Sequence, residues 1–369
     1  MKKLKILTIN PGSTSTKIAI FLNDTAIFNT TIEHQSTELI KFDTVSGQLT
    51  YRKEMILKAL DTENVDLNDL DAVVGRGGGL YAVEGGVYSI DKLLLEHTKI
   101  GINGVQHPAQ LGAQLAAEFA AKHDVPAYIV NPPDTDEYQD VARITGVKGV
   151  YRHSHLHALN LKETAIHHAK NIGKPYNQCN FIVCHIGGGV SVSAHCQGKM
   201  VDGFDIVEGE GPMAPTRCGS LSVSNIVNCL EEKTTDEVMD LCTKSGGFVS
   251  HLGTSDAREV ISKAESGDKY AKLIWDAMVY QIEKCIGSMA VVLKGKVDGI
   301  LLSGGMIYSE ILVKDIIDVC SFIAPITAYP GEFEMEAMAA GAIRVLEGLE
   351  ESKIYSGVPN WTSKNYEFN

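Results

Sequence analysis

A run of small and polar residues near the amino terminus has the composition of a phosphate-binding turn. It reads Asn10-Pro11-Gly12-Ser13-Thr14-Ser15-Thr16-Lys17. Glycine lets a backbone approach an oxyanion closely, and the four hydroxyls offer hydrogen bonds to phosphate oxygens. The G-x-x-x-x-G-K-[ST] spacing of a Walker A loop is not present in this run. By itself, the run also fits a solvated hairpin turn.

Two further glycine-rich turns follow apolar runs. His185-Ile186-Gly187-Gly188-Gly189-Val190-Ser191 places three consecutive glycines between two apolar segments, where a plain hairpin needs one or two. We interpret the excess as room for a phosphate chain against the backbone. Ser303-Gly304-Gly305 follows the apolar run 299–302 and leads into a helix, so a nucleoside or ribose could rest there, although such turns are also frequent in α/β proteins.

Strands and helices that would position these turns can be predicted from hydrophobic periodicity. The strands are expected at 5–9, 17–22, 26–32, 72–75, 127–130, 181–186, 190–195, 299–302 and 326–329. The helices are expected at 109–123, 156–171, 269–293 and 332–349. In the longest helix one stripe is expected in the core, formed by Tyr270, Leu273, Ile274, Ala277, Met278, Ile282, Cys285 and Met289.

Hairpins mixed with crossover helices predict an α/β architecture with mixed sheets. At 369 residues the chain is long enough for two domains, with substrates expected in the cleft between them. The unit of strand, glycine-rich turn and strand occurs at 5–22 and again at 181–195, which indicates two related domains. We place them at 1–149, completed by the helix at 332–350, and at 150–331, with a hinge near 151–157.

Composition excludes several classes of function. The net charge of −13 argues against a nucleic-acid or anionic-membrane surface, since both need basic patches. No apolar run approaches the ~18 residues of a membrane span, and the amino terminus does not fit a signal peptide. The eight cysteines lack a C-x-x-C pair and are interpreted as reduced thiols. The expected location is the cytoplasm.

The three turns, in this order, resemble the phosphate and adenosine motifs of the acetate and sugar kinase, Hsp70 and actin superfamily. Within it the chain resembles the butyrate kinases of the acetate kinase family. The resemblance implies the two-domain, actin-like ATPase fold, with ribonuclease H-like sheets. It spans nearly the whole sequence and is carried by residues 10–17, 76–79, 107–108, 140–143, 157–160, 185–191, 208–212 and 330–342.

The resemblance also implies roles for individual residues. Arg76 and Arg217 match the two active-site arginines of the family, and planar guanidinium forks suit a carboxylate or a phosphoryl group in flight. Among His153, His155, His157 and His168, only the motif singles out His157 as a catalytic histidine, and His107 matches another. Nucleotide contacts are implied for Asn10, Gly12, Ser13, Thr14, Ser15, Lys17, His185, Gly187, Gly188, Gly189, Ser303, Gly304 and Gly305.

Glu334 matches the magnesium-associated glutamate of the family, and Asn10 is a second candidate for the metal. Glu332 and Glu336 are explained as carboxylates that complement the dipole of the helix that starts here. The chain departs from the family at Asn131, where acetate kinases carry an aspartate. Asp134 or Asp136 could replace that charge, and Asp134 is the nearer in sequence.

The implied reaction is phosphoryl transfer from ATP to a short-chain carboxylate, with Mg²⁺, to give ADP and an acyl phosphate. Such a transfer needs little acid or base chemistry, because the carboxylate is already ionised at neutral pH. Thr216-Arg217-Cys218-Gly219-Ser220 is more similar to acetate kinases, so acetate or propionate is the alternative substrate. A non-catalytic ATP-binding protein would explain the glycine turns but not Arg76, Arg217 and His157 together. The resemblance further implies a homodimer.

Overall fold

The structure is a computed structural model that describes residues 3–366. The chain forms two compact units: the first combines Met1–Asp136 with Phe333–Asn369, and the second is Glu137–Glu332. The sequence prediction placed the first change of domain at 149 and assigned 332–350 to the first domain. Those limits, as limits of functional domains, stay a prediction.

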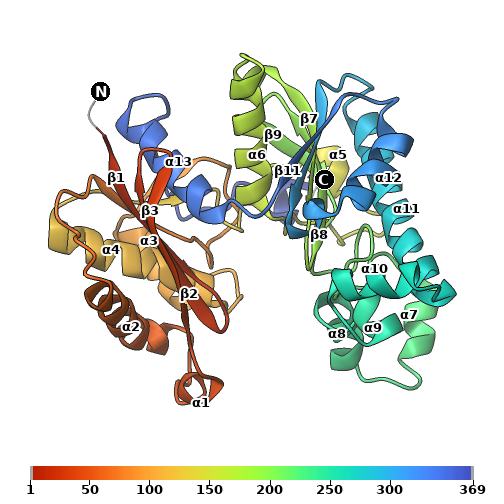
Figure 1. Cartoon of the computed structure of the whole chain (residues 1–369), viewed down its shortest axis with the longest axis horizontal. Helices are drawn as coiled ribbons and strands as arrows, with labels where there is room; N and C mark the ends of the chain where they lie inside the picture. Colours follow the sequence, from red (N-terminus) through yellow and green to blue (C-terminus); the bar gives the residue numbers. More distant parts are fainter. Residues whose placement is uncertain (1–2, 367–369) are drawn as a thin grey trace. The chain divides into compact units, whose positions relative to one another are not determined.

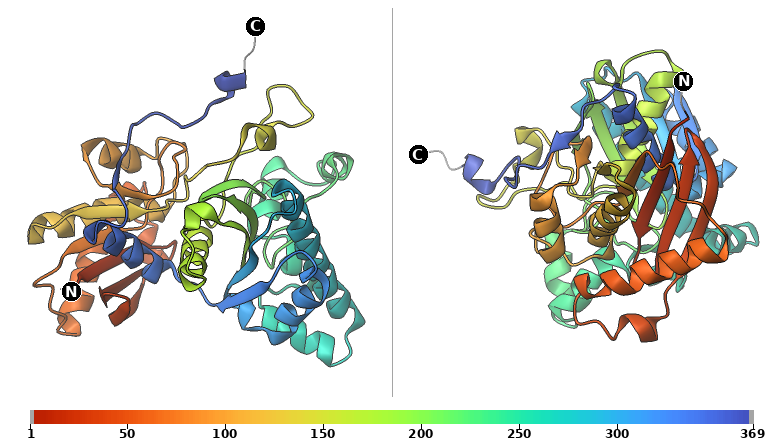
Figure 2. Two further views of the ribbon diagram at one scale, coloured as in Figure 1. Left: turned by 90° about the horizontal axis from the view of Figure 1, so that it is seen from above. Right: turned by 90° about the vertical axis from the view of Figure 1, so that its left-hand side faces the viewer.

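The first unit is built on a seven-stranded mixed sheet of order β12-β5-β6-β4-β1-β2-β3. The antiparallel part is β1 (Lys5–Pro11), β2 (Ser15–Leu22) and β3 (Thr25–Glu33), the red strands that run side by side in Figure 2. On the other edge of β1 the parallel strands β4 (Ala72–Gly75) and β6 (Ala127–Val130) follow. The short strands β5 (Val87–Ser89) and β12 (Lys353–Ile354), which were not predicted, extend this edge.

The second unit repeats this pattern in a five-stranded sheet of order β11-β10-β7-β8-β9. Its antiparallel part is β7 (Asn180–Ile186), β8 (Val190–Cys196) and β9 (Lys199–Gly203), and its parallel part is β10 (Gly299–Gly304) and β11 (Ile326–Pro330). The strands β6-β4-β1-β2-β3 and the strands β11-β10-β7-β8-β9 therefore have the same sequence of parallel and antiparallel pairings. The predicted repeat of one hairpin-based unit is confirmed, and β9 is the strand that the prediction missed.

The helices lie between and over these strands. Among the described residues, no helix combines the length and the apolar content that crossing a bilayer needs. Each of the four predicted helices forms, with limits shifted by a few residues. The bounds are α1 (Ser36–Leu39), α2 (Leu49–Thr62), α3 (Lys92–Ile100), α4 (Leu111–His123), α5 (Asp140–Arg143), α6 (Ala158–Asn171), α7 (Val223–Cys229), α8 (Thr235–Thr243), α9 (Gly247–Leu252), α10 (Ala257–Glu265), α11 (Lys269–Val292), α12 (Glu310–Cys320) and α13 (Glu334–Leu346).

The alternation of side chains along a strand explains how the second sheet is covered on both faces. Ile182 and Cys184 of β7 belong to the core shared with α11 and α12, whereas Phe181 and Val183 belong to the core shared with α6. Figure 1 shows α6 on one side of this sheet and α11 with α12 on the other. In the first unit, α4 and α13 both pack on β1, β4 and β6.

The core stripe predicted for the longest helix is partly wrong. Tyr270 and Leu273 are 50% and 60% exposed, while Trp275 and Ile286, which the stripe left out, are buried. The helix starts at the N-cap residue Asp268, whose carboxylate accepts the backbone N–H groups of Tyr270 and Ala271. Its buried face is turned by about one residue from the predicted one, because apolar residues occur on more than one side of this helix and periodicity alone does not choose between them.

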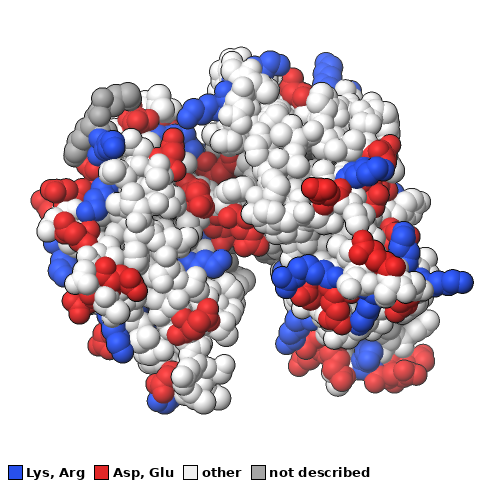
Figure 3. Space-filling view, viewed as in Figure 1, with Lys and Arg blue, Asp and Glu red and all other residues white. Residues whose placement is uncertain are grey.

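Charged side chains of both signs are interspersed over the face of the molecule shown in Figure 3. Lysines and arginines occur there singly or in small groups beside Asp and Glu.

Candidate active site

The first predicted phosphate turn connects β1 and β2, with Asn10 and Lys17 opposite each other in the register. Its tip is closed by a hydrogen bond from the Gly12 N–H to the Ser15 carbonyl oxygen, at 2.7 Å. Ser13, Thr14 and Lys17 are exposed, and the hydroxyls and ammonium of these residues are thus accessible to a ligand. The fourth hydroxyl of the run, on Thr16, is buried and lies 2.8 Å from the His34 Nε2 atom.

Arg52 of α2, which was not predicted, packs against this turn and holds it by hydrogen bonds. The side chain is fully buried. Its guanidinium donates hydrogen bonds to the carbonyl oxygens of Ser13 and Ser15, at 3.2 and 3.0 Å, and to the Thr16 hydroxyl, at 3.0 Å. Burial lowers the pKa of Arg52 to about 10. In the sequence Arg52 stands beside a lysine in an amphipathic helix, and no local signal distinguishes it from a solvent-facing residue.

Three predicted residues meet in the first unit: Asn10, Arg76 and Glu334. The Asn10 Nδ2 atom donates to Glu334 Oε2 at 2.7 Å, and Arg76 Nε lies 3.8 Å from Glu334 Oε1. Asn10 stands at the end of β1, Arg76 directly follows β4, and Glu334 begins α13. The parallel pairing of β1 with β4, and the packing of α13 on both, bring these distant positions together.

Two buried donors of the first unit, Arg76 Nη1 and Gln110 Nε2, have no acceptor among residues 3–366. Gln110 was not predicted. It completes a capping box in which the His107 N–H donates to Gln110 Oε1, at 3.2 Å, and His107 Nδ1 accepts from the Ala109 N–H, at 3.1 Å. His107 is exposed, but partial loss of water and the charges of Arg76 and Arg52 lower its pKa. Buried donors without an acceptor favour an anion.

In the second unit, Arg217 lies against the triple-glycine turn. A β-carbon at Gly189 would lie 1.5 Å from Arg217 Nη1, so a side chain there would displace the guanidinium. The Thr216 hydroxyl donates to the Gly188 carbonyl oxygen at 3.1 Å, which ties the two segments together. Arg217 Nε and Nη1 have no acceptor among the described residues. Burial lowers the pKa of Arg217, and the charge of Asp205 acts in the opposite direction.

His157 and His185 lie together beside this turn, with ring centroids 4.2 Å apart. His157 Nδ1 is 2.8 Å from the hydroxyl oxygen of Ser191, a buried residue that the prediction did not assign a role. The neighbouring histidines have other partners: His168 Nδ1 bonds to the Tyr329 hydroxyl, and His155 to Asp205. His157 thus differs from His155 and His168 in its neighbours, because it lies beside the glycine turn with Ser191 and His185.

In the third turn, two of the three predicted residues, Ser303 and Gly304, contact the neighbouring strand β7. The buried Ser303 hydroxyl donates to the Cys184 carbonyl oxygen at 3.2 Å. Gly304 has a φ of +104°, and a β-carbon there would lie 2.3 Å from the Ile186 carbonyl oxygen. At Gly305, in contrast, a β-carbon would meet nothing within 4 Å among the described residues. Gly305 is therefore the residue of this turn that has space for a ligand.

Glu332 was explained as a first-turn helix residue, and this explanation is wrong. The helix α13 begins at Glu334, so Glu332 precedes it. The Glu332 Oε1 atom would be 3.7 Å from a β-carbon at Gly187, which places this carboxylate beside the triple-glycine turn of the second unit. Glu336 lies in the first turn of α13 as expected.

Asn131, Asp134 and Asp136 have contacts within the first unit. Asn131, with a φ of +39°, exchanges backbone and side-chain hydrogen bonds with Gly86. Asp134 Oδ1 accepts from Asn103 Nδ2 at 2.7 Å, and Asp136 Oδ2 accepts the indole N–H of Trp361 at 2.8 Å. The amide of Asn131 therefore fixes the loop that carries Gly86.

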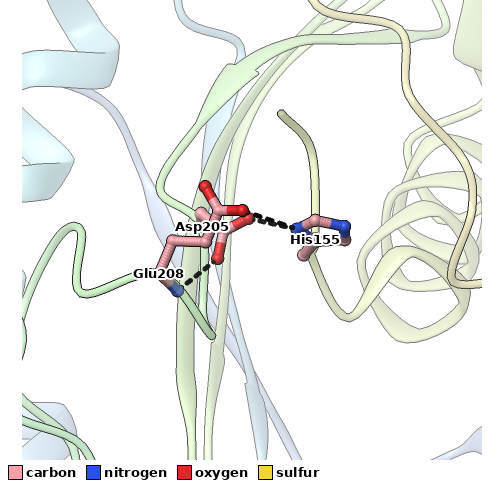
Figure 4. A group of neighbouring side chains, drawn as sticks. All are labelled: His155, Asp205 and Glu208. Carbon is pink, nitrogen blue, oxygen red and sulfur yellow. Dashed lines mark hydrogen bonds and ion pairs between the residues drawn. The ribbon is translucent and has the colours of Figure 1, made fainter. Parts of the chain in front are cut away.

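A cluster of potential metal ligands occurs at His155, Asp205 and Glu208 (Figure 4). His155 Nδ1 lies 2.6 Å from Asp205 Oδ2 and 4.0 Å from Glu208 Oε1. Asp205 Oδ1 accepts the backbone N–H groups of Val207 and Glu208. Both oxygens of Asp205 are thus engaged, and the cluster fixes the segment before His157 to the loop before Arg217. Neither Glu334 nor Asp134 belongs to a group of this kind in the described residues.

Comparison with known proteins places this arrangement in a family. The model of the Acetokinase family matches residues 129–322. A probable butyrate kinase of Clostridium botulinum is 45% identical over 353 residues, covering 95% of this chain and 99% of that protein. Butyrate kinase 2 of Clostridium acetobutylicum is 46% identical over 355 residues, covering 96% and 99%.

Solved structures of distant relatives share the fold. The acetate kinase of Porphyromonas gingivalis has a TM-score of 0.76 at 18% identity, covering 93% of this chain and 100% of that one, and the acetate kinase of Entamoeba histolytica has a TM-score of 0.74 at 17%, covering 92% and 99%. The predicted actin-like architecture with mixed sheets is confirmed. With relatives that are nearly half identical over almost its full length, this chain belongs to the acetokinase family.

Proposed function

We propose that this protein is a short-chain fatty acid kinase that converts ATP and butyrate to ADP and butyryl phosphate. The proposal is supported by full-length relatives named as butyrate kinases. In the reaction a carboxylate oxygen of the acid forms a bond to the γ-phosphorus of ATP. The bond from that phosphorus to the β–γ bridging oxygen breaks, and ADP leaves with the electron pair. No proton has to be removed from the attacking carboxylate.

One observation carries the assignment most directly: the Nε and Nη1 atoms of the half-buried Arg217 side chain are buried beside the Gly187–Gly189 turn and have no acceptor among the described residues. A phosphoryl group in transfer spreads its negative charge over three oxygens, and a fixed guanidinium in a water-poor site stabilises that charge. We assign Arg217 to the transferring group, with His157 as a second hydrogen-bond donor. The glycine turn would accommodate the phosphates of the nucleotide.

In the first unit, Arg76 Nη1 and Gln110 Nε2 supply buried donors without an acceptor among the described residues. We assign Arg76 to the carboxylate of the acid. A planar guanidinium matches the two carboxylate oxygens, and a fixed orientation of the attacking oxygen removes much of the entropic barrier to transfer. Asn10, Gly12, Ser13, Thr14, Ser15 and Lys17, whose turn Arg52 holds in place, are assigned to the phosphate chain.

Glu334 and Asn10 are the residues that would hold Mg²⁺. The Glu334 carboxylate is bonded to the Asn10 amide N–H, which leaves the Asn10 amide oxygen as a further ligand. This oxygen set fits Mg²⁺, which takes few protein ligands and keeps several waters. When bound with the nucleotide, Mg²⁺ would neutralise charge on the phosphates. Asp134 stays a candidate for an additional ligand.

A direct test measures acyl phosphate formation by trapping it as the hydroxamate. Acetate, propionate, butyrate, valerate and isobutyrate are compared with ATP and Mg²⁺. We expect the highest kcat/KM for butyrate, with each methylene changing it by roughly tenfold to a hundredfold. A maximum at acetate would assign the alternative substrate that the 216–220 motif favours. ATP binding without hydroxamate from any acid would support the non-catalytic alternative. Homodimer formation and a cytoplasmic location remain predictions from the resemblance.

A further inference from the structure

The hydroxyl of Ser191 makes two hydrogen bonds to His157. Ser191 lies in β8, is fully buried, and stands opposite His185 in the register of β7 and β8. Its hydroxyl oxygen is 2.8 Å from His157 Nδ1 and accepts the His157 backbone N–H at 3.3 Å. Among residues 3–366, these are the hydrogen bonds of the Ser191 hydroxyl, and both involve one residue.

The position of the protons follows from counting donors and acceptors. A serine hydroxyl has one proton and two lone pairs, and here the backbone N–H of His157 occupies one lone pair. If His157 Nδ1 carried a proton and donated it to Ser191, the hydroxyl proton would be buried without an acceptor. If the hydroxyl donates to an unprotonated Nδ1, every group in the pair is satisfied. The second arrangement leaves the ring proton on Nε2.

A second contact limits rotation of the same ring. The His185 ring packs on the His157 ring with centroids 4.2 Å apart and planes inclined by 31°. His185 is buried and belongs to β7 directly before the glycine turn. The imidazole of His157 is therefore held on one face by a ring and at Nδ1 by a hydroxyl, both from the hairpin that carries the turn.

We propose that Ser191 is a positioning residue that keeps His157 in the tautomer with its proton on Nε2, so that Nε2–H donates to an oxygen of the transferring phosphoryl group. This inference rests on the proposed function for its catalytic part. Ser191 itself touches neither substrate nor nucleotide in this role. It acts by fixing which nitrogen of His157 is the donor, a property that a merely space-filling serine would not control.

The chain offers a matched control two residues along the same strand. Ser193 is also fully buried, and its hydroxyl lies 2.9 Å from His195 Nε2, so it forms a serine–histidine pair of similar geometry. It also donates to the Val183 carbonyl oxygen. His195 pairs with Tyr176 and belongs to no predicted site. Ser193→Ala therefore removes a comparable hydrogen bond from the same strand without altering His157.

The experiment compares Ser191→Ala, Ser191→Thr and Ser193→Ala in the full-length protein. Kinetics with ATP and butyrate give kcat and KM, and long-range ¹⁵N–¹H spectra give the tautomer of His157, assigned with His157→Gln. We expect the Nε2–H tautomer in the wild type and mixed tautomers in Ser191→Ala. The kcat of Ser191→Ala should fall about tenfold to a hundredfold with little change in KM. Ser191→Thr, which keeps the hydroxyl, should recover most of kcat, and Ser193→Ala should retain it.

The proposal is overturned by an Nδ1–H tautomer in the wild type, by wild-type kcat in Ser191→Ala, or by a folded Ser191→Thr as slow as Ser191→Ala. If Ser191→Ala does not fold, the tautomer of His157 in the wild type and the kcat of Ser191→Thr still test the proposal. A wild type that makes no acyl hydroxamate contradicts the proposed function instead, and the spectra then test the Ser191–His157 pair separately.

Discussion

The guanidinium of Arg217 occupies the space that a side chain at Gly189 would need. A β-carbon at Gly189 would lie 1.5 Å from Arg217 Nη1 and 2.5 Å from Cζ, whereas one at the neighbouring Gly188 would meet no atom of the described residues within 4 Å. Glycine is therefore favoured at these two neighbouring positions for different reasons. Gly189 makes room for an arginine of the protein, and Gly188 borders space that is open to a ligand.

Gly189→Ala should move Arg217 and slow the reaction. The clash is with the end of a flexible side chain, so the fold should tolerate it while the guanidinium turns away from the turn. We expect kcat to fall at least about a hundredfold, as when a fixed donor to the transition state is lost, with a melting temperature close to that of the wild type. Steady-state kinetics and thermal melts check this. A folded variant with normal kcat would show that Arg217 is not held for catalysis by this contact.

Gly188→Val should act on nucleotide binding instead. Because the protein leaves this position open, valine should fit in the ligand-free enzyme, but it would intrude on phosphates that lie against the backbone. We expect the affinity for ADP to fall about tenfold or more, which corresponds to the loss of one charge-assisted hydrogen bond. Isothermal titration calorimetry measures this affinity. Unchanged affinity in a folded variant would mean that the turn is structural.

Arg217→Lys should reduce kcat by at least about a hundredfold although the positive charge is retained, because lysine lacks the planar set of donors. The donors at stake are Nε and Nη1, which have no protein acceptor among the described residues. Arg258→Lys is the control, since Arg258 is an exposed arginine of the same unit with its partner in the same turn. Kinetics with saturating ATP and butyrate distinguish the two. Equal kcat for both variants contradicts the assignment of Arg217.

Removing the Glu334 carboxylate should raise the Mg²⁺ requirement. In Glu334→Gln we expect the Mg²⁺ concentration for half-maximal rate to rise about tenfold to a hundredfold, at fixed total ATP. Asp134→Asn and Asp136→Asn are measured in parallel, because either carboxylate is a candidate for the charge missing at Asn131. A shift in Asp134→Asn assigns Asp134 as a further ligand. If neither aspartate variant shifts the Mg²⁺ curve, Glu334 and Asn10 are the protein ligands; no shift in Glu334→Gln would refute the site.

Stability should fall in weak acid partly through His34. Burial and, secondly, the charge of Arg52 lower the pKa of His34 from 6.5 to about 4. Between these values the unfolded chain binds a proton that the folded protein does not, so stability is lost as the pH falls from about 6.5 to about 4. His34→Gln removes this contribution. Over this pH range, unfolding of the variant should take up about one proton less than unfolding of the wild type, so its stability should depend less on pH. Urea unfolding at several pH values measures the difference.

The control for His34 is His251→Gln, at an exposed histidine whose ring bonds to Tyr270. His168 and His195, whose pKa values burial also lowers, are present in all the compared proteins and cancel. If His34→Gln and His251→Gln have the same pH dependence of stability, the buried His34 does not contribute as proposed.

Local sequence patterns predicted nine of the twelve strands and four of the thirteen α-helices of the described residues. The strands β1, β2, β7 and β8 could be predicted because apolar runs bounded by glycine-rich turns have few other solutions. The strands at 87–89 and 353–354 could not, because two or three residues carry no periodicity and these strands exist only through pairing with the rest of the sheet. The buried face of α11 likewise depended on the sheet and helices that it packs on.

The sequence, through its three turns and its resemblance to a family, also predicted which residues do the chemistry, among them Arg76, His157, Arg217 and Glu334, and these roles stay predictions. Only the tertiary structure decided what each of them touches. Arg52 beneath the first turn, Ser191 at His157 and the close contact of Arg217 with Gly189 join segments far apart in the chain. Side-chain partners of this kind are set by the register of strands and the packing of helices, which are long-range properties that no local window of sequence contains.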